Sequence, residues 1–186
     1  MTALNTPGAV RRAIRERVKE ILDGKTPAGA AVFISRSLPT DAEAMPAIGI
    51  YITGETVERF NEAPKDYRRD VSLLIEVNLA ADTDDELDDK REIFADIIED
   101  ILERDETLGG IVDSLWLNGT EFAQDSGGEI PVGKISILYT VRFYLDAQLP
   151  SEDLFEFQGA DVDWRIKRPE QTPTTVDAED EINVQP

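Results

Sequence analysis

The sequence predicts an α+β fold: a mixed, mainly antiparallel sheet of about four to five strands, packed by two helices and followed by an extended C-terminal arm. Apolar residues recur at three- and four-residue spacing in two segments, which is typical of helices. In other segments they alternate with polar residues, which is typical of strands. After Pro150 prolines and acids replace this periodicity, so the arm is expected there.

The first helix is predicted over residues 7–23. Thr6 can cap it, and Pro7 suits its first position, where a missing N–H costs nothing. Gly24 can end it in the left-handed conformation. Arg11, Arg12 and Arg15 lie off the apolar stripe, so they either form a solvated face or contact an acidic partner.

Five segments are predicted as strands: 30–35, 46–53, 67–80, 111–124 and 134–147. The third and fifth alternate so regularly that each has one buried face. The segment between the first two reads as a loop, and residues 125–133 as a hairpin loop. Asn118-Gly119 indicates either a further hairpin turn or a bulge, and we favour the bulge because the segments it would separate are short.

Residues 81–94 could be a metal site or a helix start, because six carboxylates lie between Asp82 and Asp89. Thr83 and Glu86 fit a capping box, and acids in a first turn face the positive end of the helix dipole. A calcium loop needs a glycine at its sixth position, and none is present here. We therefore predict a helix through residue 102, with no metal ligands and no cofactor.

Composition restricts the chemistry. The 186 residues include no cysteine and no histidine, which excludes a Ser-His-Asp triad and thiolate ligands. The net charge of −20 disfavours binding to nucleic acid. The sequence contains no run of eighteen apolar residues, so no membrane span is predicted. We expect no enzymatic activity; the alternative is a metal-dependent hydrolase.

Two regions are expected: a domain over 1–149 and an acidic extension over 150–186, partly disordered when isolated and especially from about residue 169. The extension interleaves acids with Phe155, Phe157 and Trp164. These aromatic residues either pack back on their own domain or dock on a neighbouring subunit or partner.

The order of these elements and five stretches of sequence resemble the tail terminator proteins of long-tailed bacteriophages, the minor tail protein U family. The stretches are MPAIGIYITGE (45–55), YRRDVSLLIEV (67–77), residues 84–110, LWLNGTE (115–121) and PVGKISILYTVRFY (131–144).

The resemblance, which covers about residues 7–147, implies a structural role. Such proteins form a six-membered ring on the tail tube, stop its polymerisation and contact the head-completion protein. It places the chain at the head-proximal end of the tail in the virion, and in the host cytoplasm during assembly. DNA would pass through the ring without specific binding. Another neck or tail completion protein, or a head–tail adaptor, is the alternative within this class.

Overall fold

The computed structural model describes residues 5–35, 37–38, 41–62, 65–125, 130–146, 160–164 and 178–182. The chain divides into two compact units, Met1–Ala147 and Gln148–Pro186. The first unit contains both helices and a five-stranded sheet, and the second contains two short strands.

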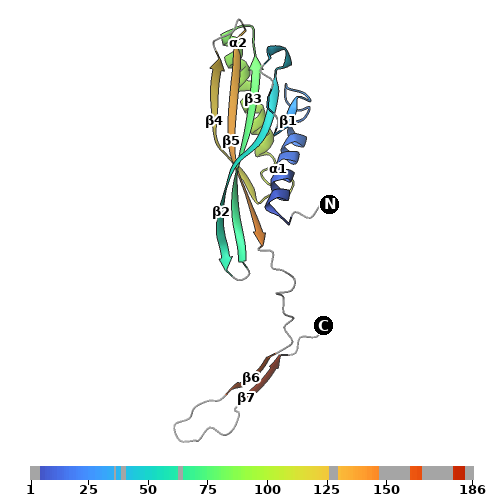
Figure 1. Ribbon diagram of the computed structural model, residues 1–186, viewed down its shortest axis with the longest axis vertical. Coiled ribbons are helices and arrows are strands. Elements are labelled where there is room, and N and C mark those ends of the chain that lie inside the picture. Colours follow the sequence, from blue (N-terminus) through green and yellow to red (C-terminus); the bar gives the residue numbers. More distant parts are fainter. Residues whose placement is uncertain are drawn as a thin grey trace. The chain divides into compact units, whose positions relative to one another are not determined.

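The sheet has the strand order β1-β2-β3-β5-β4 (Figure 1). β1 (Val32–Ile34) runs parallel to β2 (Ala47–Glu62), and every other neighbouring pair is antiparallel. The remaining strands are β3 (Lys65–Ala80), β4 (Ser114–Asp125) and β5 (Val132–Asp146). The predicted fold class, a mixed and mainly antiparallel sheet packed by two helices, is confirmed.

Helices α1 (Pro7–Leu22) and α2 (Asp84–Glu103) pack against the sheet and form the core with one of its faces. Alternate residues of β3 from Val71 to Leu79 are buried against them, while the residues between are only partly buried. The same alternation runs along β5 from Ile135 to Phe143. This period of two identifies one helix-covered face and one open face of the sheet.

Both helices begin at the predicted caps. The side-chain oxygen of Thr6 accepts a hydrogen bond from the Ala9 N–H at 3.3 Å, and Thr83 accepts one from the Glu86 N–H at 3.3 Å. Glu86 reaches back one residue further than expected, to the N–H of Asp82 at 3.1 Å. The acidic run from Asp82 to Asp89 therefore contains the start of a helix, as predicted.

Several segments differ from prediction, including residues 111–113, which were predicted as strand but precede β4. β2 continues to Glu62, nine residues beyond the predicted end, because the β2–β3 hairpin extends as a ribbon with mostly exposed side chains. A short 3-10 helix, Ala42–Ala44, lies in the predicted loop. The register shifts between Leu117 and Gly119, which confirms a bulge within one strand.

The second unit contains an antiparallel ribbon of β6 (Ala160–Trp164) and β7 (Ala178–Ile182), where no strands were predicted. Its register places Asp161 opposite Glu181 and Asp163 opposite Glu179. Like charges at opposed positions weaken a strand pair, and an isolated two-stranded ribbon is marginally stable. Partial disorder of the isolated extension stays a prediction.

Candidate assembly surfaces

A row of interacting side chains crosses four strands on the open face of the sheet. The guanidinium of Arg142 on β5 donates to the carboxylate of Asp70 on β3 at 2.7 and 2.8 Å, and it lies 5.0 Å from the ring centroid of Trp116 on β4. Arg68 on β3 continues the row to Glu58 on β2 at 2.5 Å. Each arginine in the row is paired with a carboxylate of a neighbouring strand.

The ion pair sets the protonation of both groups. The hydrogen bonds from Arg142 lower the pKa of Asp70 below its ordinary value of 3.8. The Asp70 carboxylate in turn raises the pKa of Arg142. The shifts favour the charged form of each group, and the pair joins strands β3 and β5.

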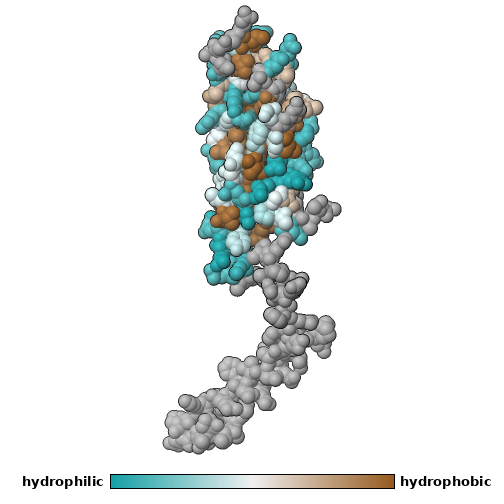
Figure 2. Space-filling view, viewed as in Figure 1, coloured by the Kyte–Doolittle hydropathy of each residue, from teal (hydrophilic) through white to brown (hydrophobic). Residues whose placement is uncertain are grey.

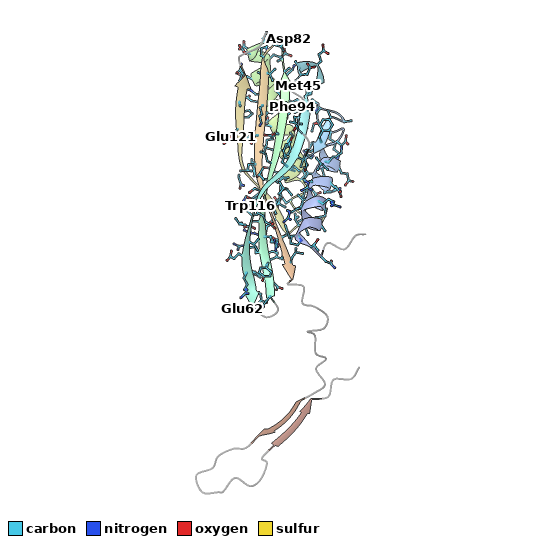
Figure 3. All side chains as sticks on the ribbon, viewed as in Figure 1. Met45, Glu62, Asp82, Phe94, Trp116 and Glu121 are labelled. Atoms are coloured by element: carbon cyan, nitrogen blue, oxygen red, sulfur yellow. The ribbon has the colours of Figure 1, made fainter. Side chains whose placement is uncertain are left out.

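Exposed aromatic side chains lie beside this row. The rings of Phe60 and Tyr144 are 5.2 Å apart in an edge-on arrangement, and Trp116 is 38% exposed. Figure 2 shows hydrophobic and hydrophilic side chains interspersed over the first unit, and Figure 3 places Trp116 near the middle of the sheet. Exposed aromatic residues beside paired arginines are typical of the centre of a protein interface.

The three arginines singled out on α1 occupy different environments. Arg11 forms an ion pair at 2.5 Å with Glu55 of β2, which also binds Arg69 at 3.0 Å. Arg12 is exposed, and Arg15 is partly buried. Within the described residues neither Arg12 nor Arg15 has an ion pair, so these two are the better candidates for contact with another molecule.

The outward face of α2 is acidic. Its exposed carboxylates that form no ion pair with the described residues are Asp84, Asp85, Asp89, Glu92, Asp96 and Glu103. The basic residues of α2 are already paired with acids of the same helix: Lys90 with Glu86, Arg91 with Asp88. The helix therefore offers unpaired negative charge to a partner.

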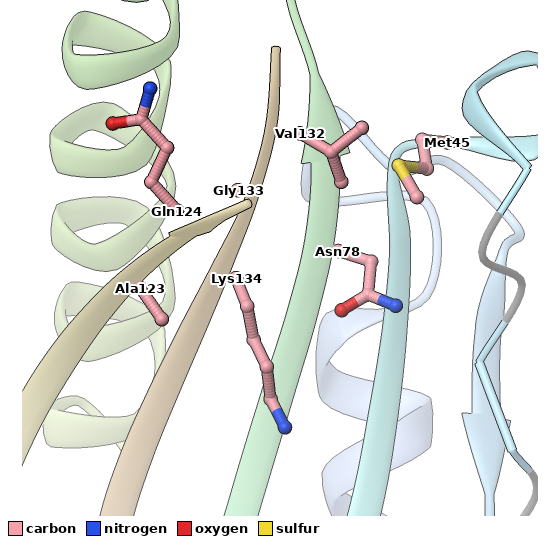
Figure 4. A pocket seen from close by; sticks show the side chains of 7 residues that line it. All are labelled: Met45, Asn78, Ala123, Gln124, Val132, Gly133 and Lys134. Carbon is pink, nitrogen blue, oxygen red and sulfur yellow. The ribbon is translucent and has the colours of Figure 1, made fainter. Parts of the chain in front are cut away.

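The first unit contains several hollows between its described residues. The one in Figure 4 has a volume of 310 Å³, and the charged residue among its described lining residues, Lys134, forms an ion pair with Glu76. Among the described residues, no three potential metal ligands come together, and no helix is long and apolar enough to cross a membrane.

Of the aromatic residues singled out in the extension, Trp164 is the last residue of β6, while Phe155 and Phe157 lie outside the described residues. Sequence reasoning missed the row on the open face. Its members come from four strands, and only the strand register brings them together.

Comparison with known proteins identifies the class. A family model of phage tail proteins matches residues 9–143, so the chain is a structural protein of phage tails. It belongs to the phage minor tail protein U family. Curated protein sequences give no match. A chain in a solved structure, "Virion of native gene transfer agent (GTA) particle", is 13% identical with a TM-score of 0.43, and the match covers 75% of this chain and 98% of that chain.

Proposed function

We propose that the protein forms a ring on the end of the tail tube, stops polymerisation of the tube and provides the surface for joining the head. Family membership supports a place in the tail. The observation that carries the ring is the distribution of charge over the helix layer. α1 contacts β1 and β2, whereas α2 contacts β5 and β4, so the two helices lie toward opposite edges of the sheet.

A ring requires a head-to-tail interface between two different surfaces of the subunit. Arg12 and Arg15 on α1 provide positive charge, and Glu103 at the end of α2 provides negative charge, with no ion pair to the described residues. An ion pair of 2.9 Å between Arg17 and Asp105 joins α1 to the segment that follows α2. That pair lies within one subunit; in our proposal the unpaired Arg12 and Arg15 of one subunit meet Glu103 of the next.

The partners in this proposal are other copies of the chain, the tail tube protein and a head-completion protein. The six-membered ring comes from the resemblance. The net charge of −20 supports passage of DNA through the ring without specific binding, since like charges repel. During assembly the protein would act in the host cytoplasm, and in the virion at the head-proximal end of the tail.

The experiment adds the purified full-length protein to growing tail tubes and images the tube ends. Rings on one end of each tube, with tube growth stopped, would support the proposal. Attachment to portal-bearing heads without effect on tube growth would instead identify a head–tail adaptor. Growth that continues past bound protein would exclude termination.

A further inference from the structure

We propose that residues 164–168 of the C-terminal extension dock on the first half of α2 in a second copy of the chain. The inference rests on the self-association in the proposed function. It does not depend on attachment to the tail tube, so the two can fail separately.

The receiving surface is an apolar hollow of 270 Å³ beside α2. Its lining residues are Pro27, Pro46, Leu79, Ala80, Lys90, Ile93 and Phe94. Ile93 is 54% exposed, which is unusual for an isoleucine on a helix that already buries its own apolar stripe. The hollow can take one more apolar side chain, and covering Ile93 would remove apolar surface from water.

Acidic residues lie around Ile93 on the surface of α2. Asp89 and Asp96 lie one helical turn before and after Ile93, and Glu92 is its neighbour in sequence. All three are exposed and form no ion pair with the described part of the chain. Lys90, a cation that lines the hollow, already binds Glu86 at 2.9 Å and the Ala80 carbonyl at 3.2 Å. A ligand for this surface should combine apolar side chains with positive charge.

One stretch of the extension has this combination. Residues 164–168 read WRIKR, and they contain all three basic residues found between positions 148 and 186, against ten acids in the same region. Apolar and basic residues alternate from Trp164 to Lys167 in the sequence. The remainder of the extension is acidic, so α2 would repel it.

Chain length favours a second copy over the same chain. Asp146, where β5 ends, is paired with Asp66, fourteen positions along β3 from Ala80 at the hollow. This separation is about 46 Å at about 3.3 Å per residue. The eighteen Cα–Cα steps from Asp146 to Trp164 span at most about 65 Å, and the route must also pass around the sheet to the helix layer. Docking within one chain would therefore use most of the length that a fully extended linker can reach.

Disulfide cross-linking tests the contact cleanly, because the chain has no cysteine. Full-length Ile93→Cys and affinity-tagged full-length Ile166→Cys are mixed and oxidised. We expect the mixed dimer to exceed both homodimers. In the control, the Ile166→Cys chain is mixed with Glu62→Cys in place of Ile93→Cys. Glu62 lies at the end of β2, and its side chain is 85% exposed. A mixed dimer no more abundant than with this control would overturn the proposal, as would a double-cysteine chain that closes on itself.

Charge reversal supplies a second test with the same readout. The first set of substitutions makes the extension acidic: Arg165→Glu, Lys167→Glu and Arg168→Glu. The second set makes the surface of α2 basic: Asp89→Lys, Glu92→Lys and Asp96→Lys. Each set is introduced into both cysteine variants. Each set alone should lose the cross-link, because like charges then face each other. Combining chains of the two sets should restore it. Unchanged cross-linking in either set alone, or no restoration on mixing, would contradict the docking.

Discussion

Asp70 on β3 and Arg142 on β5 are directly paired residues of neighbouring strands, and their side chains join in a two-pronged ion pair on the open face of the sheet. The residues are 72 positions apart in the chain. The pair therefore contributes to the register between β3 and β5 and holds Arg142 over the Trp116 ring.

The Asp70 ion pair should make stability depend on pH in acid. The pKa of Asp70 is lower in the folded protein than its ordinary value of 3.8, so the unfolded chain binds more protons between these two values. The pair stabilises the fold fully above that window and progressively less as the pH falls through it. Asp70→Asn should lower the urea midpoint at pH 7, and the difference from the parent protein should shrink below about pH 4. A difference that persists unchanged at pH 2 would contradict this.

Loss of the α2 cap should destabilise the fold by a modest amount. Thr83→Ala removes the acceptor for the Glu86 N–H, and such substitutions typically cost about 1 kcal/mol. Urea unfolding followed by circular dichroism measures the change. Thr83→Ser keeps the acceptor oxygen and serves as the control, so an equally destabilised Thr83→Ser protein would point to the lost methyl group instead.

Removing the hydroxyl oxygen of Tyr139 should not destabilise the fold. Its side chain is fully buried, and its hydroxyl has no hydrogen-bond partner within the described residues. Burial, with Glu99 and Glu103 nearby, raises its pKa above the ordinary value. Tyr139→Phe should therefore be neutral or stabilise the fold by up to about 1 kcal/mol in thermal or urea unfolding. A clear loss of stability would reveal a hydroxyl partner.

Sequence reasoning predicted the helices and the long strands because one face of each is buried. Thr6, Thr83 and the alternation along β3 are local signals, and the structure confirms them. Sequence reasoning did not predict a strand over residues 54–62 of β2, because most side chains of this ribbon are exposed on both faces. Where burial does not distinguish the two faces, the alternation that marks a strand disappears.

The candidate surfaces were less predictable than the fold. The sequence indicated that Arg11, Arg12 and Arg15 lie off the apolar stripe of α1, but it could not show that Arg11 binds Glu55 of β2. The row through Asp70, Arg142 and Trp116 depends on strand register, which one sequence does not specify.

Close packing of β5 against α2 should make Gly133 intolerant of a side chain. A Cβ at Gly133 would lie 3.1 Å from Leu87 Cδ1 and 3.1 Å from Arg91 Cδ, and Leu87 is fully buried and cannot move freely. Gly133→Ala should cost about 1–3 kcal/mol in urea unfolding. Gly119→Ala is the matched control because nothing lies within 4 Å of its Cβ position. Equal stability of the two variants would indicate that α2 shifts to make room.

Subunit association should depend on Arg12 and Arg15. The double variant Arg12→Glu, Arg15→Glu places negative charge where our proposal brings the acidic end of a neighbouring α2, so the mass in solution should fall toward the monomer at a given concentration. Arg11 is left unchanged because it pairs with Glu55, and its loss would leave the Glu55 carboxylate with Arg69 as its ion-pair partner. The control, Lys25→Glu with Lys65→Glu, changes the net charge equally at two exposed positions outside the helices and should have little effect on association.

Raised salt should weaken association of the parent protein, since about 0.1 M salt screens charges beyond about 10 Å. If both double variants weaken association equally, total charge rather than the α1–α2 contact controls it.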